Sequence, residues 1–365
     1  MWTQPARMGG ILTGTSDPTG QGYLGFSYED AFGSPLIIDG IFFYKQSMNH
    51  AGTAGDFKAI DLQTGQTLWT NPALNGISAT QPLKGQLLDF QQADQHGITG
   101  GLLWQVIGTT WVGYDVFTGN WVCNLTGVPS GTEVYTNTGD ILRYQWSYSS
   151  TTGVGWMALW NDTAAMTNAP ASASAYGPGQ EIRIDGQVID ASKSTMIATT
   201  NTGSVFDAGN SYSWNVTLPT NLPKGTNSIV GIIPGDMILG TNSSSQITLS
   251  AIPIVPTNPW IMWAISDNPA TRGQLLWTKT YDPAPNNYTI MLAWYPIDPI
   301  DPINHVWTMT YADTGQRLGF SMLDGTQLWG PVGIPDSDIN GSGLQYYSSR
   351  EGSAAYGNLY VSGYG

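Results

Sequence analysis

One segment constrains the fold of this chain more than any other: residues 59–69, which read AIDLQTGQTLW. An apolar strand ends at Asp61, the chain turns at Thr64 and Gly65, and a second strand then runs to Trp69. Glycine supplies the positive φ that a tight turn needs, and the flanking apolar residues favour strands. The segment therefore predicts a β-hairpin.

The hairpin pattern recurs along the chain. A close copy spans residues 319–329 (GFSMLDGTQLW), with Ser321 in place of Asp61. A looser copy spans residues 112–121 (VGYDVFTGNW), and a third copy with a longer turn spans residues 262–277. Recurrence of one supersecondary unit indicates a repeat architecture, in which each unit packs against its neighbours.

A second recurring signal is a Gly, Asp or Asn turn directly before an apolar strand. It occurs at residues 39–42, 139–142, 185–188, 235–238 and 357–360. The second, third and fourth occurrences lie roughly 50 residues apart, and each longer interval has room for two units. Propeller blades have this spacing, because a twisted four-stranded sheet buries both faces only between neighbouring blades. The sequence therefore predicts an all-β fold, a β-propeller of about seven four-stranded blades, with six or eight also compatible.

The same pattern predicts the domain organisation. Residues 1–33 are Gly-rich and are expected to form an irregular lead-in, and residues 34–365 are expected to form the propeller. The last unit stops at Gly365 after one or two strands. We therefore expect the lead-in, another chain or a missing segment to complete that blade. Long surface loops are expected at residues 163–180, 217–227 and 295–302.

Composition and charge argue against several classes of partner. Only 10% of the residues are charged, and no window shows sustained helical periodicity, which favours an all-β chain. The net charge of −14 would repel nucleic acid and anionic membrane surfaces, so neither is an expected partner. The sequence contains no 18-residue apolar run, so no membrane span is expected. The single cysteine, Cys123, cannot form an intrachain disulfide and is expected to be a buried, inert thiol.

N-glycosylation sequons are spread along the chain. Their acceptor residues are Asn124, Asn161, Asn215, Asn242, Asn287 and Asn340. A chain rich in Asn, Ser and Thr produces some sequons by chance. The scarcity of Lys and Glu nevertheless favours, as the sequons do, a protein that is exported from the cell. We therefore expect an extracellular or cell-surface protein that is glycosylated.

The pattern A-x-D-x-x-T-G-x-x-x-W at residues 59–69 resembles the repeat of the pyrroloquinoline-quinone-like (PQQ-like) β-propellers, a family that includes quinoprotein alcohol dehydrogenases. Residues 93–144 are similar, less specifically, to large archaeal cell-surface proteins built from such propellers. The resemblance implies a fold and leaves the function open, because dehydrogenases, assembly scaffolds and surface proteins all use this propeller.

The resemblance also implies what a quinone-dependent dehydrogenase would need. Enzymes of that family resemble one another in a disulfide between adjacent cysteines stacked on the quinone, and in a calcium ion held by Glu, Asn and Asp. Cys123 alone cannot form that disulfide. The glutamates lie in no recognisable counterpart of the calcium site; they are Glu29, Glu133, Glu181 and Glu351. We therefore expect neither a PQQ cofactor nor quinone-dependent oxidation.

A candidate calcium site lies near the end of the sequence. Asp336, Asp338 and Asn340 alternate before a glycine, as in the first half of a calcium-binding loop. The twelfth position of that pattern is Tyr347 instead of the bidentate Glu of an EF-hand, so a polar surface turn is the alternative. Ca²⁺ is the metal ion that the sequence favours.

Catalytic candidates are few. His96 and His305 are the candidates for a general base, with a solvated or core histidine as the alternative, and no two histidines have metal-ligand spacing. Asp298 and Asp301 form a candidate carboxylate pair, with an exposed proline-rich loop as the alternative. The sequence contains no G-x-S-x-G, H-E-x-x-H or phosphate-binding glycine motif.

Two hypotheses of function remain. The first is a non-catalytic extracellular scaffold or binding module with a protein or glycan partner at the cell surface, motivated by the repeats and the sequons. The second is a carbohydrate-active hydrolase or lyase that uses a loop-lined pocket at one end of the propeller. It is motivated by the abundant aromatic residues, whose faces suit stacking on sugars. A histidine beside two carboxylates in a deep pocket would favour the enzyme.

Overall fold

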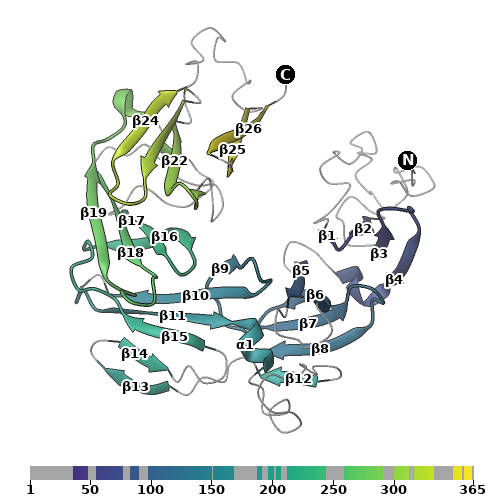
Figure 1. Ribbon diagram of the computed structural model, residues 1–365. Helices are drawn as coiled ribbons and strands as arrows, with labels where there is room; N and C mark the ends of the chain where they lie inside the picture. Colours follow the sequence, from purple (N-terminus) through teal and green to yellow (C-terminus); the bar gives the residue numbers. More distant parts are fainter. Residues whose placement is uncertain are drawn as a thin grey trace, which may run out of the picture. The chain divides into compact units, whose positions relative to one another are not determined.

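A computed structural model gives the arrangement of the strands (Figure 1). It describes residues 36–47, 55–76, 83–89, 98–149, 151–167, 187–190, 196–200, 203–206, 212–243, 259–288, 290–291, 300–311, 314, 316–332, 348–355 and 357–363. The predicted lead-in, residues 1–33, lies outside the described residues. The chain divides into two compact units, the first comprising Met1–Arg143, Leu159–Thr195 and Phe206–Trp214, and the second comprising Tyr144–Ala158, Met196–Val205 and Asn215–Gly365.

Among the described residues, five sheets contain four strands in the order of a propeller blade, and two of these sheets have a fifth strand. We number these blades along the chain. Blade 1 consists of β1 (Leu36–Ile38), β2 (Ile41–Ser47), β3 (Gly55–Asp61) and β4 (Thr67–Asn71). Blade 2 consists of β5 (Leu83–Asp89), β6 (Ile98–Ile107), β7 (Thr110–Asp115) and β8 (Trp121–Thr126). Blade 3 consists of β9 (Thr132–Tyr135), β10 (Ile141–Tyr148), β11 (Gly155–Asn161) and β15 (Tyr212–Thr217).

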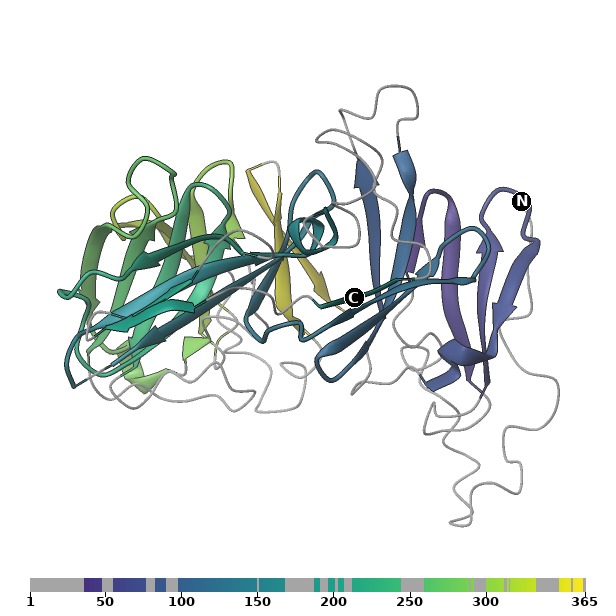
Figure 2. The same ribbon diagram turned by 90° about the horizontal axis from the view of Figure 1, so that it is seen from below.

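Blades 4 and 5 complete the series. Blade 4 consists of β16 (Thr226–Ile233), β17 (Met237–Ser243), β18 (Trp260–Ser266) and β19 (Leu275–Tyr281). In blade 5, β20 (Ile290–Met291) and β21 (Ile300–Asp301) both pair with β22 (Val306–Tyr311), which continues into β23 (Arg317–Ser321) and β24 (Gln327–Val332). Figure 2 shows the strands of each blade running side by side. The described residues thus confirm the predicted all-β class with four-stranded propeller blades.

The remaining elements are short. Two hairpins stand outside the five blades, β13 (Met196–Thr200) with β14 (Gly203–Phe206) and β25 (Ser348–Ala355) with β26 (Asn358–Gly363). The helical segments are η2 (Pro72–Gly76), α1 (Asp162–Thr167) and η3 (Pro285–Asn287). Within the described part of the chain, no helix is long and apolar enough to cross a membrane.

One predicted unit is wrong. The turn signal at residues 185–188 was expected to start a new blade, but the strand there, β12 (Gln187–Asp190), pairs in parallel with β8 of blade 2. A single blade, blade 3, therefore spans the interval between the signals at residues 139–142 and 235–238. The reason is that a local turn signal does not determine which strand the following strand pairs with. The outer strand of blade 3, β15, comes only after a long connection.

The turn between the third and fourth strands gives the repeated hairpin its shape. In blade 1, Oδ1 of Asp61 accepts from the backbone nitrogen of Thr64 at 2.6 Å and from its hydroxyl at 2.9 Å, and Gly65 has φ of 76°. In blade 2, Asp115 accepts from the same two groups of Thr118 at 2.7 and 2.8 Å. The Asp side chain thus satisfies the turn backbone, and the glycine allows the chain to reverse.

In blades 1 and 4, the tryptophan that ends the repeated hairpin joins its blade to the next one. Nε1 of Trp69 in blade 1 donates to the carbonyl oxygen of Val116 in blade 2 at 2.9 Å. A Cβ atom at Gly119, in the same blade 2 turn, would lie 2.7 Å from the ring of Trp69. Trp277 of blade 4 donates in the same way to Met322 of blade 5 at 2.7 Å. Each indole therefore lies on a turn whose glycine leaves room for it.

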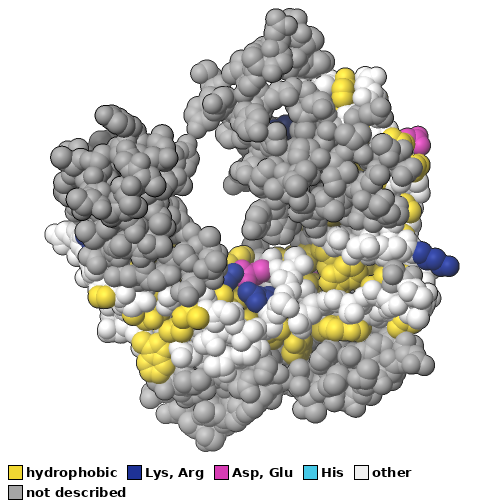
Figure 3. Space-filling view, turned by 180° about the vertical axis from the view of Figure 1, so that it is seen from behind, with side chains coloured by type: hydrophobic (Ala, Val, Ile, Leu, Met, Phe, Trp, Pro, Cys, Tyr) yellow, Lys and Arg dark blue, Asp and Glu magenta, His cyan; other side chains and the backbone are white. Residues whose placement is uncertain are grey.

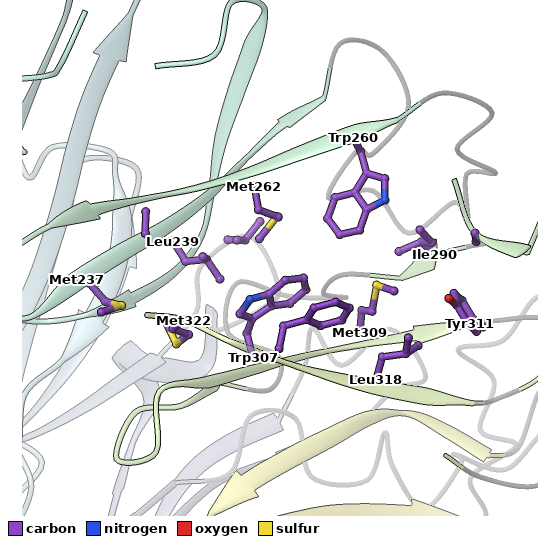
Figure 4. Packing of buried hydrophobic residues seen from close by; sticks show 14 residues of the cluster. Met237, Leu239, Trp260, Met262, Ile290, Trp307, Met309, Tyr311, Leu318 and Met322 are labelled. Atoms are coloured by element: carbon purple, nitrogen blue, oxygen red, sulfur yellow. The ribbon is translucent and has the colours of Figure 1, made fainter. Parts of the chain in front are cut away.

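Between neighbouring blades lies an apolar core. At the junction of blades 4 and 5, the side chains of Trp260, Met262, Trp307 and Met309 lie in one buried cluster (Figure 4). Trp307 stacks on Phe320 with ring centroids 4.3 Å apart, and Trp260 stacks on Tyr281 at 4.4 Å. A second cluster joins blades 1 and 2 and includes Phe57, which is fully buried. Because burial of a large apolar side chain contributes about 1.5–3 kcal/mol, these clusters dominate the cohesion of the blades.

The docking of Trp69 predicts the effect of replacing Gly119. Gly119→Ala places a methyl group against the indole and forces an L-residue to adopt φ of 70°, so we expect a loss of about 3 kcal/mol in the free energy of unfolding. Gly108→Ala is the matched control, because Gly108 also has positive φ but has no atom within 4 Å of the added Cβ. We expect a loss of about 1 kcal/mol there. Urea unfolding checks both values, and equal losses would contradict the docking.

Candidate functional site

The structure describes part of the predicted sites. His305 and Asp301 are described, and so are the sequon residues Asn124, Asn161, Asn215 and Asn242. Asn287 is described in its backbone only. The general-base candidate His96, the candidate calcium ligands Asp336, Asp338 and Asn340, and Asp298 of the carboxylate pair lie outside the described residues. These predictions remain open.

His305 pairs with a carboxylate from the neighbouring blade. It lies in the turn before β22, with φ of 53°, and its Nε2 is 2.6 Å from Oδ2 of Asp236 in the turn between β16 and β17. The side chains are 27% and 43% exposed. A carboxylate that is hydrogen-bonded to an imidazole orients the ring, so this pair has the elements of a solvent-accessible base.

A buried carboxylate lies next to this pair. Asp267 is 1% exposed, and its backbone nitrogen donates to the carbonyl oxygen of Asp236 at 2.8 Å. Its Oδ2 accepts from the Tyr144 hydroxyl and from the backbone nitrogen of Gly235, both at 2.7 Å, and its Oδ1 accepts from Nε of Arg272 at 2.9 Å. We call these residues the Asp267 network. It joins blade 3 to blade 4 through Tyr144.

The Tyr144 hydroxyl of the Asp267 network stays protonated. Burial raises the pKa of Tyr144, and the charge and hydrogen bond of Asp267 raise it further. The tyrosine therefore remains a hydrogen-bond donor at physiological pH. Among the described residues, no group of three or more His, Cys, Asp and Glu side chains is arranged to hold a metal ion. The chemistry that this region offers is that of the exposed His305 and Asp236 pair.

Asp301 caps its own turn. Its Oδ1 accepts from the backbone nitrogens of Ile303 and Asn304, both at 3.0 Å, and its Oδ2 accepts from the Asn304 side chain at 2.7 Å. The hydrogen bond from the Asn304 side chain lowers the pKa of Asp301, so the carboxylate stays ionised. Asp301 is 6% exposed and lies in β21, so the alternative of an exposed loop is wrong for this residue. Its role here is to shape the turn that carries His305.

A charged cluster joins blades 2 and 3. Glu133 of β9 contacts Lys84 of β5, and its Oε2 accepts from Arg143 of β10 at 2.9 and 3.1 Å. The Arg143 guanidinium lies 4.9 Å from the ring centroid of the buried Trp111. Burial opposes ionisation of Glu133, but the hydrogen bond and charge of Lys84 together with Arg143 outweigh it and lower its pKa. Figure 3 shows basic and acidic side chains together beside apolar patches on the described surface.

A second carboxylate at this junction has only neutral donors among its described partners. Asp162 is fully buried; its Oδ1 accepts from the backbone nitrogen of Ile141 at 2.8 Å and its Oδ2 from Nε2 of Gln86 at 2.5 Å. The Gln86 side chain in turn accepts from Nε1 of Trp104 at 2.6 Å. Burial raises the pKa of Asp162 to about 7, against the effect of these hydrogen bonds, and the nearby charge of Asp140 adds to the rise.

Sequence reasoning found His305 but missed the residues around it. Asp236 lies 69 positions before His305, and no local pattern connects them. A usable signal exists in hindsight: both residues lie in the turn before the second strand of their blade, where neighbouring blades bring equivalent turns together. Lys84, Glu133 and Arg143 lack even that signal, because they come from strands without a shared motif.

The sequon asparagines differ in their surroundings. Asn242 is 2% exposed, and its Nδ2 donates to the carbonyl oxygen of Lys224 at 3.0 Å and to Oδ1 of Asn227 at 3.3 Å. A glycan would have to be attached to that same nitrogen, so this fold disfavours the prediction of glycosylation at Asn242. Asn161 is partly exposed, and its Oδ1 caps α1 by accepting from the backbone nitrogen of Ala164 at 3.0 Å.

Comparison with known proteins gives only distant structural likeness. No family model matches the chain and no curated protein matches it. BamB from Moraxella catarrhalis aligns with a TM-score of 0.37 at 9% identity, over 91% of this chain and 70% of BamB. Quinohemoprotein alcohol dehydrogenase ADHIIG from Pseudomonas putida HK5 aligns at 0.27 and 14%, over 82% of this chain and 41% of that one.

A third solved structure is similar to a comparable degree. The V. cholerae biofilm matrix protein Bap1 aligns with a TM-score of 0.25 at 13% identity, over 68% of this chain and 39% of Bap1. This chain thus spans less than half the length of the dehydrogenase and of Bap1. TM-scores this low are no basis for transferring a function, and the propeller assignment rests on the blades themselves.

The buried Asp162 predicts a pH-dependent stability. Its folded pKa of about 7 lies above the unfolded value of about 3.9, so it favours folding when protonated, and this contribution is lost as pH rises toward 7. As pH rises from 5 to 8, we expect the wild type to lose about 2–3 kcal/mol of unfolding free energy that Asp162→Asn does not lose. Urea unfolding at the two pH values measures this change.

Asp324→Asn provides the control for this measurement. The hydrogen bonds from Thr326 lower the pKa of the Asp324 carboxyl, so the group is ionised in both folded and unfolded chains throughout this pH range. Its effect on stability should therefore be the same at pH 5 and pH 8. An effect of Asp162→Asn that is equally independent of pH would contradict the assignment.

Proposed function

We propose that this chain is an extracellular, glycosylated β-propeller that acts as a non-catalytic scaffold or binding module at the cell surface. The main observation in support of the proposal is that the buried charged groups of the blades bind neighbouring blades. Asp162, Asp267 and Glu133 each bind a group on a neighbouring blade. The hydrogen bonds of these groups stabilise the junctions between blades. The blades then form a rigid support for the loops that connect their strands.

The proposed partner is a protein or a glycan, and it meets the loops at the ends of the blades. Long stretches of sequence separate β17 from β18 and β24 from β25. Loops on a rigid scaffold are where propellers commonly bind. Binding of Ca²⁺ by Asp336, Asp338 and Asn340 belongs to the same proposal.

A second candidate function rests on His305 and Asp236. A carbohydrate-active hydrolase or lyase needs an accessible base, and the 2.6 Å contact between these partly exposed side chains supplies one. The scaffold is favoured, because His305 is hydrogen-bonded to one carboxylate, that of Asp236. The neighbouring carboxylate, Asp267, already accepts hydrogen bonds from Tyr144, Gly235 and Arg272. A glycosidase of the usual kind requires two carboxyl groups facing one bond.

A polysaccharide assay separates the two functions. We expect the purified chain to release no reducing ends from acidic or neutral polysaccharides, whether or not it binds them. Because the pair is exposed, His305→Ala should leave the folded state and any binding unchanged to within about twofold. Release of reducing ends that falls by roughly 100-fold or more in His305→Ala would contradict the scaffold and establish the enzyme.

Glycosylation of the secreted chain is tested by site-resolved mass spectrometry. We expect glycans on sequons with accessible side chains, such as Asn124, and none on Asn242, because its amide is buried and hydrogen-bonded. Asn242→Asp should destabilise the fold by about 1–3 kcal/mol, since a carboxylate oxygen would replace the donor that faces three acceptor oxygens. The absence of glycan from every sequon, in protein secreted by a glycosylating host, would contradict this part of the proposal.

A further inference from the structure

Trp121 and Asn124 lie on β8, the strand of blade 2 between β7 and β12, and share one face of it. Nε1 of Trp121 donates to Oδ1 of Asn124 at 2.8 Å. The register of β8 against β7 explains how residues three positions apart come together. Trp121 pairs with Tyr114 while Cys123 pairs with Gly113, so β8 carries one extra residue between them. That bulge moves Trp121 to the face that Asn124 occupies.

The same face carries the rest of the sequon. Along β8, Cys123 and Leu125 are buried, whereas Asn124 and Thr126 are partly exposed. In an extended strand, residues two apart lie on one face, so the acceptor asparagine and the threonine of the sequon both lie beside the indole. The hydrogen bond uses Oδ1 of Asn124, and the glycan-bearing atom of a glycosylated asparagine is the other terminal atom, Nδ2.

The indole itself is strongly exposed for so large an apolar side chain. Trp121 has 45% of its surface exposed. In blade 1, Trp69 instead lies on the turn of the following blade and donates to its backbone, and Cys123 takes the sheet position of Trp69 in blade 2. Trp121 instead donates to an asparagine on its own strand. The face of an exposed indole is an apolar, electron-rich surface of the kind on which the C–H groups of a sugar ring stack.

We propose that Trp121 is the platform on which the first sugar of a glycan at Asn124 stacks, an inference that rests on the proposed glycosylation. Attachment at Nδ2 leaves the carbonyl oxygen of the linking amide available, so the indole N–H keeps its acceptor and the link is held beside the ring. The first sugar then covers apolar surface that is otherwise in water. The ligand class of this surface is an N-linked hexosamine that belongs to the chain itself.

Asn124 thereby differs in kind from the other sequon residues whose contacts are known. The Asn242 amide nitrogen is used inside the fold, and Asn161 holds the start of α1. Neither hydrogen bond comes from an indole. Among these three, the arrangement at β8 is the one that presents an aromatic face to an attached sugar.

The test uses the N-acetylglucosamine-initiated glycan that a yeast secretory host attaches. Endoglycosidase treatment trims each glycan to a single N-acetylglucosamine, and mass spectrometry reports occupancy at Asn124. We expect the acetyl and ring protons of that sugar to be shifted upfield in NMR spectra of the wild type by the ring current of Trp121. The shift should be lost in Trp121→Ala and partly kept in Trp121→Phe, whose ring is smaller.

Leu276→Ala is the matched control, because Leu276 is 46% exposed on the outer strand of blade 4 and lies near no sequon in sequence. It should leave the upfield shift unchanged. If Asn124 is glycosylated and its sugar resonances are the same in the wild type and in Trp121→Ala, the inference that Trp121 is a platform is wrong, whereas the proposed glycosylation is supported. Glycans at other sequons with Asn124 empty would have the same consequence, whereas a chain with no glycan at all would overturn both.

Discussion

Covering both faces of a four-stranded sheet is the constraint on which the rest of this structure depends. A blade that is apolar on both faces cannot be stable alone, so it needs neighbours that fit it at a fixed distance. Trp69 and Trp277 supply that fit by lying on the turn of the following blade and donating to its backbone at 2.9 and 2.7 Å. The apolar clusters behind them provide most of the stabilisation, and the indoles fix the register of one blade against the next.

Polar groups at the junctions follow from the same constraint. A buried carboxylate is costly unless donors surround it, and two aspartates meet this requirement in different ways. Asp267 has Arg272 as a counterion in addition to Tyr144 and Gly235. Asp162 has neutral donors, and burial consequently raises its pKa to about 7. The junction that contains Asp162 is thus expected to weaken as pH rises.

Much of the fold could be predicted from sequence, because its determinants are local. Asp61, Thr64 and Gly65 form their turn with the hydrogen bonds and the positive φ that the pattern indicates. The turn signal failed at β12, because hydrogen bonding between strands far apart in sequence is a property of the assembled sheet. The candidate site shows the same limit. His305 could be selected as a rare residue type, but its partner Asp236 comes from another blade.

A crystal structure of the chain is the decisive test of whether blades 1 and 4 are docked on the following blades through Trp69 and Trp277. Docking predicts the indole of Trp69 against Gly119, with its nitrogen about 2.9 Å from the Val116 carbonyl oxygen, and Trp277 in the same position over Gly325. Electron density that places both indoles in solvent, or against their own blades, would contradict the account.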